Sequence, residues 1–266
     1  MIAVLGAGVM GEVFVSGLIR GGTSPARIVI SEKREDRARE VAERYGVRAL
    51  PPAEAVREAA TVLILVKPQD MGALLPEIAP ALADGAVVVS FAAGITLATL
   101  ESGLPSSAAV IRAMPNTPAL VDQGITAISP GAGCSAVQTD YAVSLLSAVG
   151  PVVTVPEELQ DAVTATSGSG PAYVFLLVES MTAAAVDLGL DVDTARQLVT
   201  QTVLGAATMA SRPGADAATL RQQVTSPNGT TAAALATFEA GGFRELVLAA
   251  MTAARDRGRE LGRPSG

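Results

Sequence analysis

The chain has 266 residues, of which 49% are hydrophobic and 17% charged, with a formal net charge of −7, one cysteine and no histidine. A chain this apolar is long enough to bury a core and is too hydrophobic to be disordered. Its acidic balance argues against a nucleic-acid-binding protein. The lone Cys134 excludes a disulfide framework, and the missing histidine excludes a Ser-His-Asp triad or a His-ligated zinc.

The first part of the chain predicts alternating strands and helices. Short apolar runs with the composition of buried strands alternate with amphipathic segments, a pattern typical of right-handed βαβ units. We therefore expect an α/β domain with a doubly wound, mostly parallel sheet over residues 1–155. The predicted strands are Met1–Leu5, Arg27–Ser31, Thr61–Val66, Ala86–Phe91, Ala109–Arg112 and a last edge strand Pro151–Val155, and the predicted helices are Val9–Arg20, Glu35–Tyr45 and Met71–Leu82.

Helix-like segments take over after Pro156. Alanine is frequent in them and their faces carry few charges, as expected of helices that are covered by another subunit. We therefore expect an all-helical domain that dimerises, over residues 156–266. The predicted helices are Glu157–Thr166, Pro171–Leu188, Val192–Ser211, Ala215–Val224 and Thr230–Leu261.

The sequence GAGVMG at 6–11 is a G-x-G-x-x-G motif between the first predicted strand and the first predicted helix. In this position Gly6 allows a tight turn, Gly8 lets the backbone approach a pyrophosphate, and Gly11 lets the helix pack closely on the strand. The N–H groups of the helix N-terminus would face the phosphates. The motif predicts a Rossmann-like dinucleotide-binding domain with cofactor contacts at Gly6, Ala7, Gly8, Val9, Met10 and Gly11.

The end of the second predicted strand bears on the choice between NAD and NADP. Glu32 stands where an acidic residue would hold the ribose hydroxyls of NAD. Lys33 and Arg34 would clamp the 2′-phosphate of NADP, with Ser31 donating a hydrogen bond, and the alternative for the two cations is a solvated helix start. We favour NADPH, with Glu32 turned outward to solvent, and keep NADH as the alternative.

Three further segments follow predicted strands, at the edge where such sheets bind ligands. They are VKP at 66–68, AAG at 92–94 and RAMPNTP at 112–118. A lysine in the first would point at the cofactor crevice, and the second is small enough for a nicotinamide to lie against its backbone. An ordinary turn explains each of them equally well. The cofactor contacts expected here are Val66, Lys67, Pro68, Ala92, Ala93, Gly94 and Asn116.

Two segments interrupt the helical part. SGSGPAY at 167–173 is either a helix–helix hinge, capped by Ser169 or Gly170, or a backbone surface against which a ligand packs. TSPNGTT at 225–231 opens a helix with hydroxyl residues and free N–H groups, an arrangement suited to a small carboxylate. A capped helix start explains one of these hydroxyls but not the whole cluster.

With GxGxxG, VKP, RxMPNTP, SGSGPAY and VTSPxGTT in this order, the chain resembles pyrroline-5-carboxylate reductase over about Met1 to Leu261. The resemblance implies an oxidoreductase that reduces 1-pyrroline-5-carboxylate to L-proline with NAD(P)H, the last step of proline biosynthesis. The lack of a recognisable targeting signal favours the cytoplasm as its location. It implies a homodimer built by the helical domain, often five dimers in a decamer. It also implies an active site between the nicotinamide and the loop 226–231, completed across the dimer.

Carried over by position, the resemblance implies two catalytic residues, with Ser226 beside the substrate carboxylate and Thr231 reaching the ring nitrogen. Asn228 stands where the family commonly has glycine, and asparagine tolerates a positive φ if one is needed there. GADAA at 214–218 and Pro52 depart from the family pattern too. The substrate-binding residues implied are Glu157, Ser226, Gly229, Thr230 and Thr231.

The implied reaction needs no histidine, because a protonated imine accepts a hydride without a general base. One alternative is a reductase of a six-membered cyclic imine carboxylate that gives pipecolate. Another is a non-catalytic NADPH-binding assembly protein, against which the intact hydroxyls at 226–231 argue. A β-hydroxyacid dehydrogenase would need a lysine in the second domain, yet no lysine follows Lys67.

We expect no metal and no nucleic-acid or membrane partner. The N-terminus lacks the charged leader of a signal peptide. The longest apolar runs, such as Thr61–Val66 and Ala86–Ala93, are shorter than the ~20 residues of a membrane span.

Overall fold

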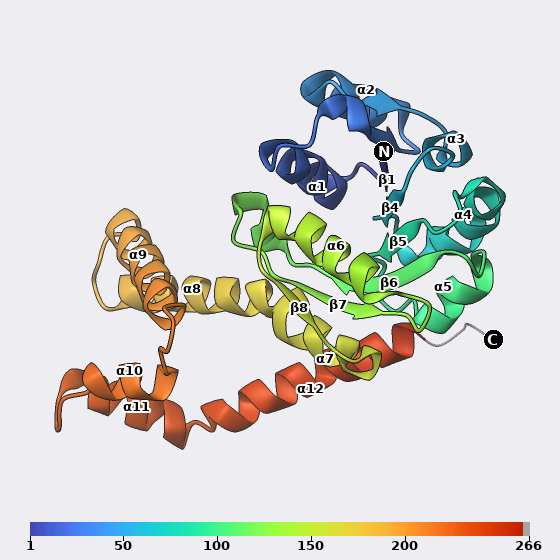
Figure 1. The fold of residues 1–266 in the computed structure, drawn as a ribbon. Helices are drawn as coiled ribbons and strands as arrows, with labels where there is room; N and C mark the ends of the chain where they lie inside the picture. Colours follow the sequence, from blue (N-terminus) through green and yellow to red (C-terminus); the bar gives the residue numbers. More distant parts are fainter. Residues whose placement is uncertain (263–266) are drawn as a thin grey trace. The chain divides into compact units, whose positions relative to one another are not determined.

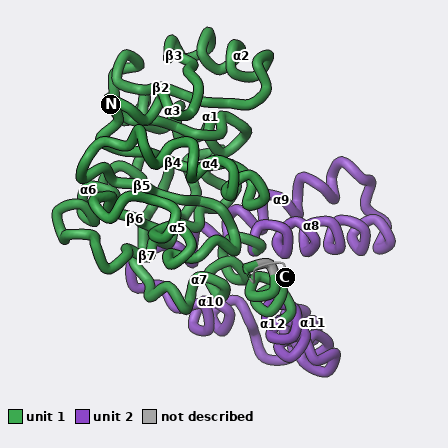
Figure 2. Tube along the Cα trace, turned by 90° about the vertical axis from the view of Figure 1, so that its right-hand side faces the viewer, with its two compact units in different colours: residues 1–169, 253–266 green, residues 170–252 purple. Residues whose placement is uncertain are grey.

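The computed structural model describes residues 1–262 and divides into two compact units (Figure 2). Unit 1 comprises residues 1–169 and the chain from Ala253 onward, and unit 2 comprises residues 170–252. The units therefore divide later than the domain boundary expected at 155/156. Residues 157–169 stay with unit 1 because they bond to its sheet: the Gln160 side chain, which is fully buried, donates to the Ser129 hydroxyl over 2.8 Å.

Unit 1 is built on a sheet whose eight strands, in the described residues, run in the order β3-β2-β1-β4-β5-β6-β7-β8 (Figure 1). In this part of the chain β6 and β7 are antiparallel and the other neighbours are parallel. This order is that of a Rossmann sheet, so the predicted doubly wound, mostly parallel sheet is confirmed. The strands are β1 (Ile2–Leu5), β2 (Ile28–Ser31), β3 (Arg48–Ala49), β4 (Thr61–Ile64), β5 (Val87–Ser90), β6 (Ala109–Met114), β7 (Thr126–Pro130) and β8 (Val152–Thr154).

Helices cover both faces of this sheet. One face packs under α1, α2 and α6 with a buried cluster around Phe14, whose ring lies 4.7 Å from that of Phe91. The other face packs under α3, α4 and α5 with a cluster around Met71 and Leu100. In β1, β2, β4, β5 and β6, successive side chains alternate between the two clusters, which explains why most of these strands read as uninterrupted apolar runs. The helices are α1 (Val9–Arg20), α2 (Glu35–Tyr45), α3 (Pro52–Val56), α4 (Met71–Ile78), α5 (Leu97–Gly103), α6 (Ala136–Leu146) and α7 (Gln160–Val163).

The pattern does not predict five of these elements, namely β3, α3, α5, β7 and α6. Two of them are very short, because β3 has two residues and α3 has five. In β7 the buried side chains include the hydroxyls of Thr126 and Ser129, so its sequence does not stand out as apolar. The α6 helix buries only Ala142 and Leu146, although its N-terminus carries a capping box at Ser135 and Gln138.

Unit 2 is helical, and α8 packs against α9 within it. The single helix expected over Thr230–Leu261 is wrong. The α11 helix ends at Ala240, Gly242 takes a φ of 71°, and α12 begins at Phe243. A left-handed glycine after a last turn is a common helix stop. The helices are α8 (Gly170–Asp187), α9 (Val192–Ala210), α10 (Ala217–Gln223), α11 (Thr230–Ala240) and α12 (Phe243–Leu261), of which α12 ends in unit 1.

No loop opens at SGSGPAY among the described residues. Instead Thr164–Gly168 forms a π-helical turn between α7 and α8, with the Ser169 N–H donating to the Thr164 carbonyl over 2.8 Å. A Cβ on Gly168 would lie 3.6 Å from the sulfur of Met114. Two of the quoted motifs, RAMPNTP and SGSGPAY, therefore lie side by side at the end of β6. Such π-turns often occur at functional sites.

The helical run Glu157–Asp187 has 31 residues and is long and apolar enough to cross a membrane by length and composition. In the single chain, none of the residues in the most apolar 18-residue stretch of this helical run is buried. Large side chains such as Phe175 (66% exposed) and Leu176 (62% exposed) lie on its surface. A continuous apolar surface of this kind requires a cover, which is either lipid or protein.

Candidate functional site

The glycine-rich loop joins β1 to α1. Gly6 has a φ of 96° and a Cβ there would lie 2.8 Å from the backbone of Leu65, while a Cβ on Gly11 would lie 1.9 Å from the Gly6 carbonyl oxygen. Both positions therefore require glycine for the fold itself. The loop is also tied to the neighbouring strand, because the Gly6 N–H donates to the Ser31 carbonyl over 2.7 Å.

Gly8 differs from these two glycines. Among the described residues, apart from Gly8 and its chain neighbours, no atom lies within 4 Å of the position of a Cβ on Gly8, and its φ of −63° suits any residue. As the N-cap of α1 it precedes N–H groups that have no partner within the helix and that carry the positive end of the helix dipole. The fold does not need a glycine here, but a pyrophosphate lying against the backbone does, so the loop fits a dinucleotide.

At the end of β2 the structure corrects one expectation. Glu32 does not turn outward: its side chain is 13% exposed, and its carboxylate accepts the Arg34 N–H over 3.2 Å. The Arg34 Nε lies 4.0 Å from the same carboxylate. The Lys33 Nζ contacts Asp70 Oδ1 at 2.5 Å, which links this segment to the turn after β4. Both cations remain largely exposed, at 75% for Lys33 and 65% for Arg34.

The other predicted cofactor residues follow β4, β5 and β6. Lys67 is exposed, Ala92 is buried, and Gly94 has a φ of 76°. The Asn116 side chain accepts the Ile125 N–H over 2.9 Å, so it closes the connection between β6 and β7. Because β1, β2, β4, β5 and β6 are parallel, the structure brings all the predicted cofactor segments to one edge of the sheet, where such folds bind ligands.

Glu157 lies in unit 1 and belongs to a cluster that the sequence analysis missed. Its carboxylate accepts the Leu97 N–H over 2.6 Å and lies 3.3 Å from Nη1 of Arg112. Arg112 is 5% exposed, inside β6, and its Nη2 lies 3.6 Å from Asp161. The sequence offered one signal for this cluster, the arginine that closes the apolar run AVIR. A guanidinium buried in a strand requires carboxylate partners.

The loop TSPNGTT lies in unit 2. Asn228 has a φ of 59°, so this departure from glycine is accommodated in the way that the sequence analysis anticipated. The Gly229 N–H donates to the Ser226 carbonyl over 3.0 Å, which closes a turn before α11. Gly229 is the N-cap of that helix and has no side chain with which to cap it. The first N–H groups of α11, at Thr230 and Thr231, therefore lack partners within the helix, as an anion site requires.

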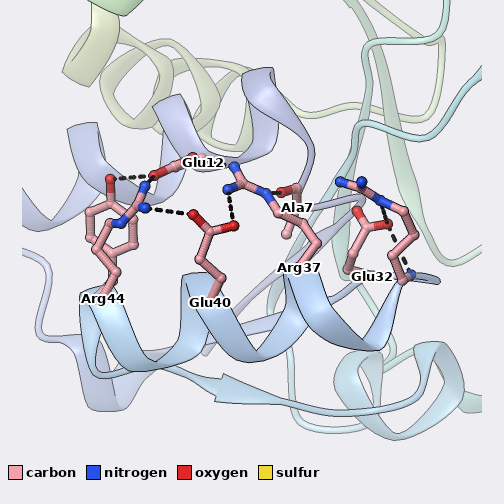
Figure 3. Close-up of polar contacts among 8 residues, drawn as sticks. Ala7, Glu12, Glu32, Arg37, Glu40 and Arg44 are labelled. Carbon is pink, nitrogen blue, oxygen red and sulfur yellow. Dashed lines mark hydrogen bonds and ion pairs between the residues drawn. The ribbon is translucent and has the colours of Figure 1, made fainter.

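A second network that the sequence analysis missed joins α1 to α2 (Figure 3). Glu12 accepts hydrogen bonds from Arg37, from Arg44 and, over 2.9 Å, from the hydroxyl of Tyr45. Glu40 accepts from the same two arginines, over 2.8 Å from Arg37 and 2.6 Å from Arg44. The spacing of Arg37, Glu40 and Arg44 along one helix face was the available signal. Partial burial raises the pKa of Glu12, but the bonds from Arg37, Tyr45 and Arg44 outweigh it and hold that pKa below the ordinary 4.5.

We expect Glu12→Gln to lower the free energy of unfolding by about 2 kcal/mol at pH 7, since hydrogen bonds to a charged group are lost. The folded-state pKa of Glu12 is depressed, so its stabilising contribution is present above pH 4.5 and is lost as the pH falls through the folded-state value. Urea unfolding of both proteins between pH 7 and pH 3 measures the difference, which should shrink in acid. Glu43→Gln, on the exposed side of α2, is the control and should change stability by less than ~0.5 kcal/mol.

A Rossmann sheet with an open Gly8, cations after β2 and a helical second unit defines an NAD(P)-binding oxidoreductase. Two family models match the chain: NADP oxidoreductase coenzyme F420-dependent over residues 1–94, and pyrroline-5-carboxylate reductase dimerisation over residues 157–261. The chain is 45% identical over 267 residues to the pyrroline-5-carboxylate reductase of Pseudomonas aeruginosa, covering all of this chain (100%) and 98% of that protein. It belongs to the pyrroline-5-carboxylate reductase family.

Two solved structures agree in fold. A pyrroline-5-carboxylate reductase from Coxiella burnetii matches with a TM-score of 0.94 at 38% identity, covering 98% of both chains. Pyrroline carboxylate reductase of Plasmodium falciparum, solved with NADP bound, matches with a TM-score of 0.86 at 26% identity, again over 98% of both chains.

The match to a dimerisation domain also explains the apolar helix. The matched residues, 157–261, include the run Glu157–Asp187 from its first residue. Its exposed apolar side chains therefore belong to a domain that joins subunits. The chain forms a homo-oligomer through its helical domain, as the low charge of these helices predicts.

Proposed function

We propose that this chain reduces 1-pyrroline-5-carboxylate to L-proline with NADPH, the last step of proline biosynthesis. The observation that carries the proposal is the uncapped helix start at Gly229–Thr231, which offers N–H groups and two hydroxyls to a small carboxylate. It occurs in a member of this family whose glycine loop leaves room at Gly8 for a dinucleotide. The cofactor preference is supported by the exposed Lys33 and Arg34, and by the NADP bound to the relative from Plasmodium falciparum.

The substrate-binding residues have distinct proposed roles. The N–H groups of Thr230 and Thr231, at the positive end of α11, bind the carboxylate of the cyclic imine together with the Ser226 hydroxyl. The Thr231 hydroxyl accepts the N–H of the protonated ring nitrogen and so orients the C=N bond. NADPH, when bound, supplies the hydride that the C=N carbon accepts. The nitrogen keeps its proton and becomes the secondary amine of proline, so no side chain has to act as a base.

Glu157 is also proposed to lie near the substrate. In unit 1 its carboxylate already holds the Leu97 N–H and Arg112. Those bonds fix the start of α5, just after Gly94, so Glu157 would act on the substrate by shaping the loop that the nicotinamide approaches.

Initial rates on pyrroline-5-carboxylate with NADPH and with NADH, in one assay, test the proposal. We expect substrate-dependent oxidation that is faster with NADPH. The same assay with a six-membered cyclic imine carboxylate tests the alternative ring, which should react more slowly. No oxidation of either cofactor would rule the proposed reaction out.

We expect Arg34→Ala to lower the preference for NADPH over NADH by about tenfold, because the proposed 2′-phosphate contact is a charge-assisted hydrogen bond. The ratio of kcat/KM for the two cofactors measures this preference. Arg57→Ala removes another exposed arginine just before β4, at the opposite edge of the sheet, and should leave the ratio unchanged. A ratio that stays at the wild-type value in Arg34→Ala would move the 2′-phosphate site elsewhere.

We further propose that five dimers assemble into a decamer and that the protein acts in the cytoplasm. The dimerisation domain that the chain matches and the exposed apolar side chains of the helical domain support assembly through that domain, and five dimers is the number that the family resemblance implies. Native mass spectrometry of the full chain distinguishes a dimer from a decamer.

A further inference from the structure

We infer that Arg37 is a positioning residue for the cofactor: it fixes the Ala7–Gly8 peptide so that the Gly8 N–H faces the phosphates. The inference rests on the proposed cofactor site at the glycine loop. Arg37 comes from α2, far from the motif in sequence, and its Nε donates to the Ala7 carbonyl oxygen over 3.1 Å (Figure 3).

The guanidinium itself is held on every side. Its Nη1 donates to Glu40 over 2.8 Å and its Nη2 donates to Glu12, while only 13% of the side chain is exposed. A planar fork with three engaged nitrogens has one orientation, which a lysine could not reproduce. Arg37 therefore presents its Nε–H to the loop as a fixed donor.

The bond to Ala7 sets the direction of the next N–H group. Among the described residues no peptide bond is cis, so the Ala7 carbonyl and the Gly8 N–H point in opposite directions across one planar unit. With the carbonyl turned toward Arg37, the Gly8 N–H must point to the other side of the loop. Because Gly8 has no Cβ, this peptide would otherwise rotate at little cost. Arg37 removes that freedom before the cofactor arrives, which favours binding.

Arg37 does not act as a charge on the phosphates. Two carboxylates, Glu12 and Glu40, neutralise its guanidinium, and both lie on the helices rather than in the loop. Its effect is therefore confined to the loop's geometry.

The test is NADPH affinity, measured by fluorescence titration of the full chain. We expect Arg37→Gln to raise the Kd of NADPH about tenfold, and Arg37→Lys at least about threefold, because the fixed donor is lost in both. At saturating NADPH, kcat and the KM for pyrroline-5-carboxylate should stay within about twofold of wild type, since the substrate loop is untouched. Thermal unfolding checks that each variant is folded. If Arg37→Gln does not fold, the Kd of NADPH for Arg37→Lys provides the test.

Arg44→Gln is the matched control. Arg44 contacts the same two carboxylates, Glu12 and Glu40, from the same helix, but in the described part of the chain its guanidinium bonds to these carboxylates and not to the loop. Its Kd should stay within about twofold of wild type. Equal weakening in the Arg37 and Arg44 variants, or wild-type affinity in both Arg37 variants, would overturn the inference. Failure of the wild-type protein to bind NADPH would instead overturn the proposed cofactor site, and the inference with it.

Discussion

Replacing Thr231 with alanine is expected to lower kcat by about 100-fold and to leave the Kd of NADPH within about twofold of wild type. Thr231 lies in the first turn of α11, in unit 2, whereas the glycine loop belongs to unit 1. The lost hydroxyl orients the ring nitrogen, and this contact matters most when the C=N carbon accepts the hydride. Steady-state rates at saturating NADPH, together with fluorescence titration of the cofactor, measure the two effects separately.

Two further variants make this result specific. Thr231→Ser keeps a hydroxyl at the same position and should restore most of the rate. Thr237→Ala changes the same helix further along, where the hydroxyl donates to the Ala233 carbonyl over 3.1 Å, and should behave like wild type. Parallel losses of kcat and of cofactor affinity in Thr231→Ala would mean that Thr231 supports the fold and not the substrate.

The sequence predicts the elements whose period or apolar run is unambiguous. The limits of α1 and α2 agree with the structure, because glycines or charged residues flank a clear helical repeat. The break at Gly242 is missed because Phe243–Leu261 continues the helical pattern after only two glycines, and composition does not show that Gly242 is left-handed. The α6 helix is missed because it buries only Ala142 and Leu146, too few apolar positions to show a helical repeat.

The site shows the same division. The backbone conformations at Gly8 and Asn228 are predictable, since each depends on the local sequence alone. The orientation of the Glu32 side chain is not predictable, because it depends on whether the Arg34 side chain folds back toward the Glu32 carboxylate. Pairs such as Arg112 with Glu157 are also hidden, since the two residues are joined only by the fold.

Replacing Gly8 with valine is expected to weaken NADPH binding by more than ~100-fold while the protein stays folded. Apart from Gly8 and its chain neighbours, no described atom lies within 4 Å of a Cβ at this position, and the φ of −63° suits valine. The loss of a favourable N-cap would lower the Tm by only about 2–4 °C. The added side chain therefore occupies space that the fold leaves open and that a pyrophosphate needs. Gly8→Ala, with a single methyl group, should show a smaller loss of affinity.

Gly133→Val is the control for this prediction. Among the described residues, apart from Gly133 and its chain neighbours, no atom lies within 4 Å of a Cβ on Gly133 either. Gly133 follows β7, whose antiparallel direction places it at the opposite edge of the sheet from Gly8. Both variants should unfold near the wild-type temperature, but only Gly8→Val should lose NADPH. Neither Gly8 nor Gly133 has to be glycine for the fold. A Gly8→Val protein that binds NADPH normally would therefore show that the pyrophosphate does not lie against Gly8.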